Sequence, residues 1–325
     1  MRLVLNLGSL FVRGTALMFA LVGATTGLLC LGGVFNDKLD ALTHWAVIWL
    51  ACGVAGLVLG AAFARDTERK AIVGLSLVAV LATGGLMTPE IAGSWFQKTK
   101  PKATPALKLV QFNLWAGNHH PEATLAWILA QKADVVTIQE AGGAAWPVVA
   151  GLLKAYPYRV SCDGARTCDT WIFSRWPMTQ KRGFLKEGLP LAGATAVVQA
   201  PGGAFPLAAV HYVWPIPAGR QQAQSRLLVS RLAPFPRQNL IVAGDFNSTP
   251  WSFSLRRQDK ALGLERRTRA LASWPSGDFS RVARAPFPIL PIDHVYAGKA
   301  WKTVKVERGP NLGSDHRPVV VTLAR

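Results

Sequence analysis

The chain has 325 residues, which is long for one average domain, so two structural units are expected. Lys and Arg number 6 up to residue 96 and 30 beyond it, whereas Asp and Glu number 5 and 13, so residues 97–325 carry a net charge of +17. This distribution excludes one uniform domain. It favours polyanionic partners, nucleic acid or anionic lipid headgroups, without distinguishing them. A basic surface that only holds the second unit against its own membrane is the alternative.

Three apolar runs near the N-terminus each approach the roughly 20 residues that span a bilayer core. They occupy Gly14–Phe35, Trp45–Ala64 and Ala71–Thr88. We predict three transmembrane helices, because a cleaved signal peptide explains the first run but not two further runs joined by short polar loops.

Basic residues indicate on which side of the membrane each short loop lies. Arg2 and Arg13 flank the start of the first run, and residues 65–70 contain three basic residues, whereas residues 36–44 contain one Lys and two Asp. Because Lys and Arg concentrate in cytoplasmic loops, an odd number of spans places the C-terminal unit outside. We therefore predict a multi-pass cytoplasmic (inner) membrane protein, with residues 1–94 as anchor, 95–106 as tether, and 107–325 as a domain on the periplasmic or extracellular side.

Two of the four cysteines lie in the second unit, in a polar loop that contains an Asp-Gly turn. Cys162 and Cys168 are close enough in sequence to form a short disulfide, which persists only in an oxidising compartment. Two unrelated thiols remain the alternative. A metal site there is disfavoured, because no third and fourth soft ligand is near in the sequence.

Short apolar runs alternate with amphipathic stretches from residue 107 onward, and several runs stop at a residue able to do chemistry. The strands expected in chain order are Leu107–Phe112, Asp134–Gln139, Thr170–Phe173, Ala194–Gln199, Leu207–Val210, Asn239–Ala243, Thr303–Val306 and Val319–Leu323, with helices at Pro121–Lys132 and Gly219–Leu232. The order lacks a regular β-α-β repeat. We therefore predict an α+β fold, a four-layer α/β/β/α sandwich of two packed mixed sheets flanked by helices, rather than a doubly wound sheet.

Five short motifs place polar residues at or near strand ends, where loops supply function on a rigid scaffold. They are Gln-Phe-Asn at 111–113, Ile-Gln-Glu at 138–140, Gly-Asp-Phe-Asn at 244–247, Ile-Asp-His at 292–294 and Ser-Asp-His-Arg-Pro at 314–318. In this order they resemble the endonuclease/exonuclease/phosphatase superfamily, which includes deoxyribonuclease I-like nucleases, abasic-site endonucleases, sphingomyelinases and inositol-phosphate phosphatases. The resemblance covers residues 107–325 and implies a metal-dependent phosphoester hydrolase.

Phosphoester hydrolysis requires neutralisation of the phosphate oxygens and a base for the attacking water. Glu140 ends an apolar strand, and Mg²⁺ prefers one or two carboxylates with waters and substrate phosphate, so Glu140 is the first expected ligand of Mg²⁺ or Mn²⁺. The resemblance implies Asn113 and Asp315 as further residues on the metal side.

His316 is the expected general base, because imidazole titrates near neutrality. The resemblance implies that Asp293 orients it, that Asp245 handles a proton or the metal, and that Asn247 positions the phosphate. Asp245 and Asn247 would share one face if their segment were extended.

The segment that contains His211 resembles the branch of the superfamily that has two catalytic histidines, so His211 is expected to be the second one. The carboxylate that partners this histidine in deoxyribonucleases has no unambiguous match, and Asp163 and Asp169 are loose candidates. His294 is expected to be structural, because it should point away from Asp293 on a strand. The three histidines without a motif are expected to be solvated or interfacial: His44, His119 and His120.

The substrate is expected to be a phosphoester, with nucleic acid ahead of phospholipid. Basic residues follow the Gly-Asp-Phe-Asn motif, and they either contact phosphates or form a solvated face. They are Arg256, Arg257, Lys260, Arg266, Arg267 and Arg269. The first alternative is a phospholipid or sphingomyelin-type phosphodiesterase, or a phosphomonoesterase. The second is an inactive module that binds polyanions. No protein partner is predicted.

Overall fold

A computed structural model describes residues 2–97, 99–100, 102–162, 168–184, 191–278 and 284–325. The chain divides into two compact units. The helical unit comprises Met1–Trp95 together with two short segments, Ile216–Gly219 and Thr249–Arg256, and the sandwich unit comprises Phe96–Pro215, Arg220–Ser248 and Arg257–Arg325.

The helical unit is built from α1 (Arg2–Leu31), η1 (Gly32–Val34), α2 (Asp37–Thr43), α3 (Ala46–Phe63) and α4 (Asp66–Trp95). Three stretches are long and apolar enough to cross a membrane, as expected, at Asn6–Val34, Ala46–Phe63 and Asp66–Trp95. Gly56 of α3 lies where these helices meet, since a Cβ there would come 2.9 Å from the backbone nitrogen of Ala20 in α1 and 2.8 Å from Ser76 Oγ in α4. Small residues thus allow close helix packing.

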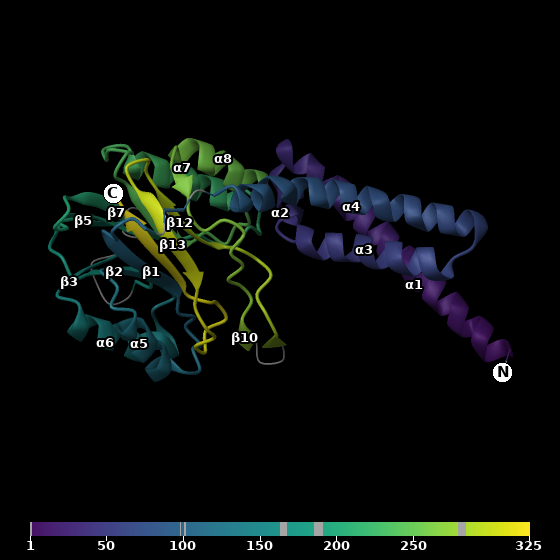
Figure 1. Cartoon of the computed structure of the whole chain (residues 1–325), viewed down its shortest axis with the longest axis horizontal. Helices are drawn as coiled ribbons and strands as arrows, with labels where there is room; N and C mark the ends of the chain where they lie inside the picture. Colours follow the sequence, from purple (N-terminus) through teal and green to yellow (C-terminus); the bar gives the residue numbers. More distant parts are fainter. Residues whose placement is uncertain (1, 98, 101, 163–167, 185–190, 279–283) are drawn as a thin grey trace. The chain divides into compact units, whose positions relative to one another are not determined.

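The sandwich unit contains two six-stranded mixed sheets (Figure 1). Sheet A has the order β13 (Lys302–Arg308), β14 (Val319–Ala324), β1 (Leu107–Asn113), β2 (Val135–Gln139), β4 (Trp171–Ser174) and β3 (Tyr158–Ser161). Sheet B has the order β5 (Met178–Gly183), β6 (Ala192–Val198), β7 (Phe205–His211), β8 (Ile241–Asp245), β12 (Asp293–Ala297) and β9 (Glu265–Arg266). A two-stranded ribbon joins β10 (Gly277–Asp278) to β11 (Arg284–Ala285).

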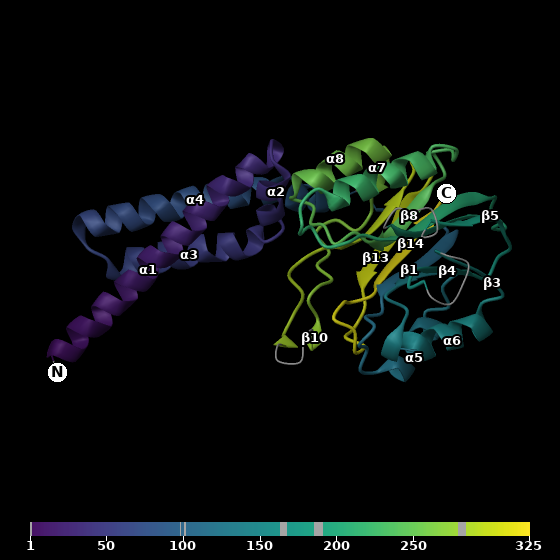
Figure 2. The same cartoon turned by 180° about the vertical axis from the view of Figure 1, so that it is seen from behind.

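Helices cover the outer faces of both sheets, as the two opposite views show (Figures 1 and 2). On sheet A lie α5 (Pro121–Ala130), η2 (Gly143–Ala145) and α6 (Trp146–Ala155), and on sheet B lie α7 (Arg220–Leu232) and α8 (Phe253–Leu262). Successive residues of β1 point to opposite faces of sheet A. Leu109 therefore belongs to the core between the two sheets, whereas Val110 packs in the core under α5 and α6. The predicted α+β sandwich of two mixed sheets is confirmed.

The predicted elements differ from the observed ones at their ends, and several observed elements were not predicted, among them α6, α8, β3, β5 and β12. The helix expected at Pro121–Lys132 stops at Ala130, and β7 and β8 continue through His211 and Asp245. These two strands extend further because parallel pairing joins His211 to Asp245, so the ladder continues into the polar residues. Hydropathy does not reveal that the strands continue, because each apolar run stops before the polar residue that ends the strand.

Two residues before β1 form backbone hydrogen bonds with strands of sheet A. The Lys100 N–H donates to the Thr303 carbonyl at 2.7 Å, and the Ala106 N–H donates to the Leu323 carbonyl at 2.8 Å. The domain boundaries at residues 94 and 106 stay predictions.

Candidate active site

One parallel strand pair in each sheet brings the expected site residues to its carboxyl end. Asn113 pairs with Gln139, directly before Glu140, at the end of β1 and β2. His211 pairs with Asp245 at the end of β7 and β8, and Asp293 of β12 pairs with the same Asp245. Both parallel pairs therefore end in residues that the motifs singled out.

Asn113 connects the two sheets at this end. Its Nδ2 donates to Glu140 Oε1 at 2.9 Å and to Asp245 Oδ2 at 2.9 Å, while its Oδ1 accepts the Trp115 N–H at 2.9 Å. Glu140 adopts a left-handed backbone conformation with φ of 50°. Its side chain thereby turns from the strand toward the carboxylate of the opposite sheet. In this orientation Asn113 donates to the expected metal ligands, and direct coordination through its Oδ1 would require the amide to turn round.

His316 lies in a buried chain of charged groups. Its Nδ1 is 2.7 Å from Asp293 Oδ2, and its Nε2 is 3.7 Å from Asp245 Oδ2. Burial by itself lowers the pKa of His316, but the charges of Asp293, Asp245 and Asp315 outweigh burial and raise that pKa well above its ordinary value. Burial also raises the pKa of Asp245 to about 6, although nearby His316 opposes this shift. The pKa of Asp293 is lowered, because the charge and hydrogen bond of His316 outweigh burial.

Polar residues within the strands support this pair. Gln111 Nε2 donates to Asp293 Oδ1 at 3.3 Å, and the Thr137 hydroxyl donates to Gln111 Oε1 at 2.7 Å. The Ser314 hydroxyl accepts the His316 N–H at 3.0 Å and donates to the Asn113 carbonyl at 2.8 Å. Gln111 was missed in the sequence, although its position two residues before Asn113 on one strand was the available signal.

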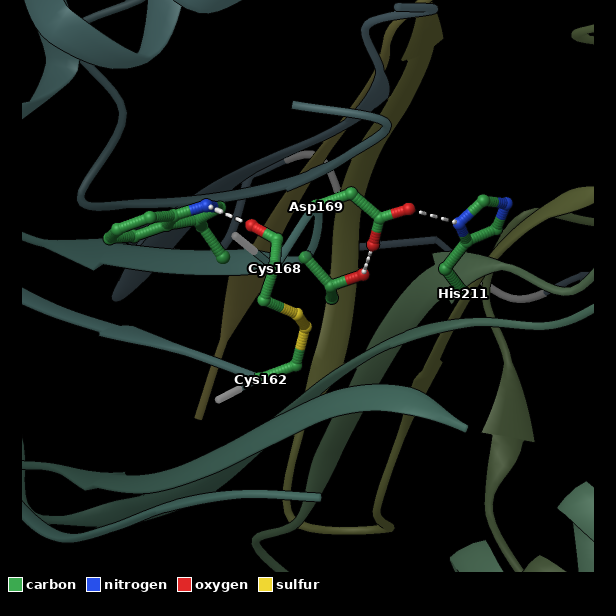
Figure 3. The surroundings of a disulfide bond; sticks show 6 residues. Cys162, Cys168, Asp169 and His211 are labelled. Carbon is green, nitrogen blue, oxygen red and sulfur yellow. Dashed lines mark hydrogen bonds and ion pairs between the residues drawn. A yellow bond between two sulfur atoms is a disulfide. The ribbon is translucent and has the colours of Figure 1, made fainter. Parts of the chain in front are cut away.

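His211 pairs with Asp169, one of the two carboxylates considered as its partner. Its Nδ1 lies 3.3 Å from Asp169 Oδ2, and the Thr170 hydroxyl donates to the other Asp169 oxygen at 2.9 Å (Figure 3). Burial lowers the pKa of His211, but the hydrogen bond to Asp169 and the charges around it outweigh burial and raise this pKa to about 9. The other candidate, Asp163, lies outside the described residues.

A disulfide bond joins Cys162 and Cys168 immediately before Asp169 (Figure 3). The Trp171 indole N–H donates to the Cys168 carbonyl at 2.9 Å, and the Ala141 N–H donates to the Asp169 carbonyl at 3.1 Å. The expected disulfide is present, and hydrogen bonds hold the backbone carbonyls of both Cys168 and Asp169.

Asn247 departs from the extended geometry expected for it. It has a φ of 46°, and its N–H donates to Asp245 Oδ1 at 2.8 Å, which closes a tight turn directly after β8. Its Nδ2 donates to the Tyr212 carbonyl at 2.8 Å. The premise that Asp245 and Asn247 share a strand face is wrong, because the Asp245 side chain captures the backbone and ends the strand. Asn247 stays beside Asp245 through this turn.

The remaining histidines divide between the surface and the interior. His119 and His120 are exposed, as expected, and His294 is buried with its Nε2 2.9 Å from the Ser248 carbonyl oxygen, which fits a structural role. His44 was expected to be solvated or interfacial, but it is buried and accepts the Thr249 N–H at 3.2 Å. It lies in α2's connection to α3, and no local sequence signal marks that contact.

The donor set fits a hard divalent cation. Ligand atoms of Glu140, His211 and Asp245 all lie within 4.8 Å of one another. Asp315 accepts the Trp274 indole N–H through Oδ2 at 3.1 Å, while its buried Oδ1 has no hydrogen-bond partner among the described residues. Burial raises the pKa of Asp315. Clustered carboxylates of this kind suit Mg²⁺ or Mn²⁺, since a cation offsets their mutual repulsion.

Two expected substrate contacts are instead structural. Arg266 and Arg267 are buried, and Arg266 pairs with Asp259 at 3.2 Å. Arg267 donates to the carbonyls of Gly298 and Trp301 at 3.2 Å and 3.0 Å. These two guanidinium groups link β9 to α8 and to the connection between β12 and β13, so they do not form a phosphate-binding surface.

Solved structures of other proteins share the fold. TDP2 from D. rerio, complexed with a single-strand DNA product, is 14% identical with a TM-score of 0.53, covering 67% of this chain and 99% of that chain. An endonuclease/exonuclease/phosphatase from Beutenbergia cavernae is 20% identical with a TM-score of 0.50, covering 68% and 72%. A protein of the same family name from Bacteroides thetaiotaomicron is 15% identical with a TM-score of 0.51, covering 68% and 98%.

No curated protein matches the sequence significantly. Residues 110–316, which include all eight expected site residues from Asn113 to His316, match the Endonuclease/Exonuclease/phosphatase family. Proteins of this family are phosphoester hydrolases that depend on divalent metal ions. The chain belongs to the endonuclease/exonuclease/phosphatase family and is a phosphoester hydrolase of that type.

Proposed function

We propose that the chain is a divalent-metal-dependent phosphodiesterase that cleaves nucleic acid outside the cytoplasmic membrane. The observation that carries this proposal is the pairing of Asp293 with His316 Nδ1 at 2.7 Å, beside the carboxylates of Asp245 and Glu140. A general base and a cation-binding carboxylate cluster thus lie within one site.

His316 is the general base of the proposed reaction. Asp293 holds the proton on Nδ1, so Nε2 is the atom that accepts a proton from water, and Asp293 stabilises the imidazolium that forms. His316 must be neutral at Nε2 to do this, whereas the surrounding carboxylates raise its pKa. A divalent cation near Glu140 offsets those carboxylates and brings the pKa of His316 back toward neutrality.

Glu140 and Asp315 would hold Mg²⁺ or Mn²⁺, joined by Asn113 once its amide turns round, and the cation would supply charge that stabilises the non-bridging phosphate oxygens. His211 then serves as proton donor to the leaving oxygen, because burial lowers its pKa but the hydrogen bond to Asp169 raises it and favours the protonated ring, and a cation at Glu140 would leave that hydrogen bond in place. Asp169 holds the ring through Nδ1 and directs Nε2 into the site, 3.7 Å from Glu140 Oε1 and 3.9 Å from Asp245 Oδ2. Asn247 positions the phosphate beside Asp245.

Charge supports nucleic acid as the substrate class. Residues 97–325 carry a net charge of +17, and the burial of Arg266 and Arg267 leaves most of that excess on other basic residues. Exposed basic side chains occur on β5 and β13, at Lys181, Arg182 and Lys305. A positive surface attracts a phosphate backbone and makes its binding depend on salt. The D. rerio fold relative bound to single-strand DNA product supports the same choice.

Two independent features support the proposed location of the site. Three apolar helices and the basic residues of the short loops predict that the C-terminal unit lies outside the cytoplasmic membrane. The Cys162–Cys168 disulfide supports an oxidising compartment.

The decisive experiment uses the full chain in detergent or nanodiscs with Mg²⁺ or Mn²⁺. The substrates are plasmid DNA, RNA, sphingomyelin vesicles and bis(p-nitrophenyl) phosphate. We expect chelator-sensitive cleavage of nucleic acid that weakens steeply with salt, and its loss in Glu140→Gln but not in the exposed control His120→Ala. Cleavage that survives the chelator contradicts the metal dependence. Hydrolysis of sphingomyelin alone would favour the phospholipid phosphodiesterase instead.

A further inference from the structure

Residues 249–256, which closely follow the Gly-Asp-Phe-Asn motif in the chain, pack within the helical unit. Asp40 of α2 is buried, and its Oδ1 accepts the Phe253 N–H at 2.8 Å while its Oδ2 accepts the Ser254 N–H at 2.7 Å. These are amides of the first turn of α8, which have no acceptor inside their own helix. Asp40 therefore supplies the anionic group that caps this helix.

His44 holds the beginning of the same segment. Its Nδ1 accepts the Thr249 N–H at 3.2 Å, and its carbonyl accepts the Trp251 indole N–H at 3.3 Å. Burial lowers the pKa of His44 to about 4, although the charge of Asp40 opposes this shift. The ring is consequently neutral near pH 7, and Nδ1 keeps the lone pair that this hydrogen bond needs.

The segment matters for the active site because Thr249 follows Asn247 by only two residues. Asn247 has a φ of 46°, in the left-handed region that Asn adopts more readily than other non-glycine residues. Within the sandwich unit, Asp245 Oδ1 accepts the Asn247 N–H, and Gln221 Nε2 donates to the Asn247 carbonyl at 2.9 Å. His294 Nε2 lies 2.9 Å from the Ser248 carbonyl oxygen. In the helical unit, the chain after Ser248 is held at Thr249 by His44, and at Phe253 and Ser254 by Asp40.

We propose that Asp40 and His44, in the connection between the first two apolar helices, are positioning residues for catalysis that keep the turn at Asn247 in its working conformation. The proposal rests on the phosphodiesterase activity proposed above and deepens it. The helices then do more than anchor the enzyme, because part of their connection completes the support of a catalytic loop. An enzyme deprived of residues 1–95 loses that support.

The test compares variants of the full chain in nanodiscs. Asp40→Ala removes both oxygens that accept the Phe253 and Ser254 N–H groups, whereas Asp40→Asn retains one of them. His44→Ala removes the nitrogen that accepts the Thr249 N–H, and in His44→Asn the side-chain Oδ1 replaces that acceptor. Lys38→Ala is the matched control, because Lys38 lies exposed on the same short helix. We expect kcat to fall at least about tenfold in Asp40→Ala and His44→Ala with KM changed less than threefold, since a displaced catalytic group costs rate before affinity. His44→Asn should recover most of the loss, and Lys38→Ala should match the unaltered chain.

Hydrogen exchange, measured by mass spectrometry, provides a readout that does not need activity. We expect amides of residues 245–248 and 249–256 to exchange faster in Asp40→Ala, while those of β1 and β2 keep their protection. Faster exchange in β1 and β2 would indicate general unfolding of the alanine variants. In that case the kcat values of Asp40→Asn and His44→Asn are compared with those of the alanine variants, because only a positioning role predicts graded recovery of kcat.

Unchanged exchange at residues 245–248 in both alanine variants overturns the positioning proposal, whatever the activity. Equal kcat in His44→Ala and His44→Asn also overturns it. An unaltered chain that hydrolyses no phosphodiester overturns the proposed function instead, and the exchange result still decides whether Asp40 and His44 hold the turn.

Discussion

The site contains two histidine–carboxylate pairs that are supported in different ways. His316 and Asp293 lie 2.7 Å apart with side chains only 4% and 1% exposed, and Asp293 begins β12, where it pairs with Asp245 of β8. His211 and Asp169 lie 3.3 Å apart with side chains 17% and 39% exposed, and Asp169 belongs to a loop beside a disulfide. Sheet pairing supports the first pair, and a covalent cross-link flanks the second.

This difference indicates a division of tasks. A general base needs one fixed tautomer, and a buried carboxylate on a rigid strand provides it. A proton donor to the leaving group must face a substrate that enters and leaves, so a more exposed partner is acceptable. We therefore expect the buried pair to dominate catalysis, and the four predictions below test that ranking.

Removing the buried pair should have the largest effect. We expect His316→Ala and Asp293→Asn each to lower kcat by about 10³-fold or more, because the base is lost in one and its tautomer is no longer enforced in the other. The double variant should be no worse than His316→Ala, since the two residues act as one unit. Rates are measured on bis(p-nitrophenyl) phosphate with Mg²⁺, with His120→Ala as control. Multiplicative losses in the double variant would contradict the pairing.

Disrupting the exposed pair should cost less. We expect Asp169→Asn to lower kcat by about tenfold to a hundredfold, because His211 keeps its place on β7 but loses the carboxylate that orients it and raises its pKa. In a His211→Ala background the same change should have no further effect. The measurement is the same assay across the four members of this cycle. A loss equal to that of Asp293→Asn would mean that the two pairs do not differ as their exposure suggests.

Opening the disulfide should have a smaller effect on the same pair. We expect Cys162→Ser combined with Cys168→Ser to lower kcat only severalfold, since hydrogen bonds still hold the Cys168 and Asp169 carbonyls. A reductant should produce the same loss in the unaltered chain and none in the double variant. Activity is followed before and after reductant treatment. Complete loss on reduction would show that the cross-link, rather than these hydrogen bonds, maintains the pair.

The pH dependence of stability should show the smallest effect. In metal-free protein the pKa of His211 is about 9, above its ordinary 6.5, so its pairing contributes stability that is complete below pH 6.5 and lost as pH rises through 9. We expect Tm to fall by about a few degrees between these values, with His316 contributing in the same direction. Asp169→Asn should reduce this fall, as measured by calorimetry with chelator present. An identical fall in this variant would exclude the contribution of the exposed pair.

Much of the site was predictable because its residues end or follow apolar runs. Glu140 and Asp245 close strands whose hydrophobic character is plain, and His316 lies in a polar motif just before the last strand. By contrast, the support of these residues was not predictable. The spacing of Gln111 places it on the strand face of Asn113 but does not reveal its contact with Asp293, and the turn at Asn247 depends on the Asp245 side chain, which accepts a backbone N–H. Hydropathy carries no record of either interaction.

The sequence by itself determined the family and the two-part division of charge and predicted a set of candidate catalytic side chains, because these follow from composition and from short contiguous motifs. Only the tertiary structure decided which carboxylate pairs with His211. Asp169 lies 42 residues before His211, and Asp40 lies more than 200 residues before the amides it accepts. Partners so distant in the chain are selected by strand pairing and close packing, which bring particular atoms within hydrogen-bonding distance.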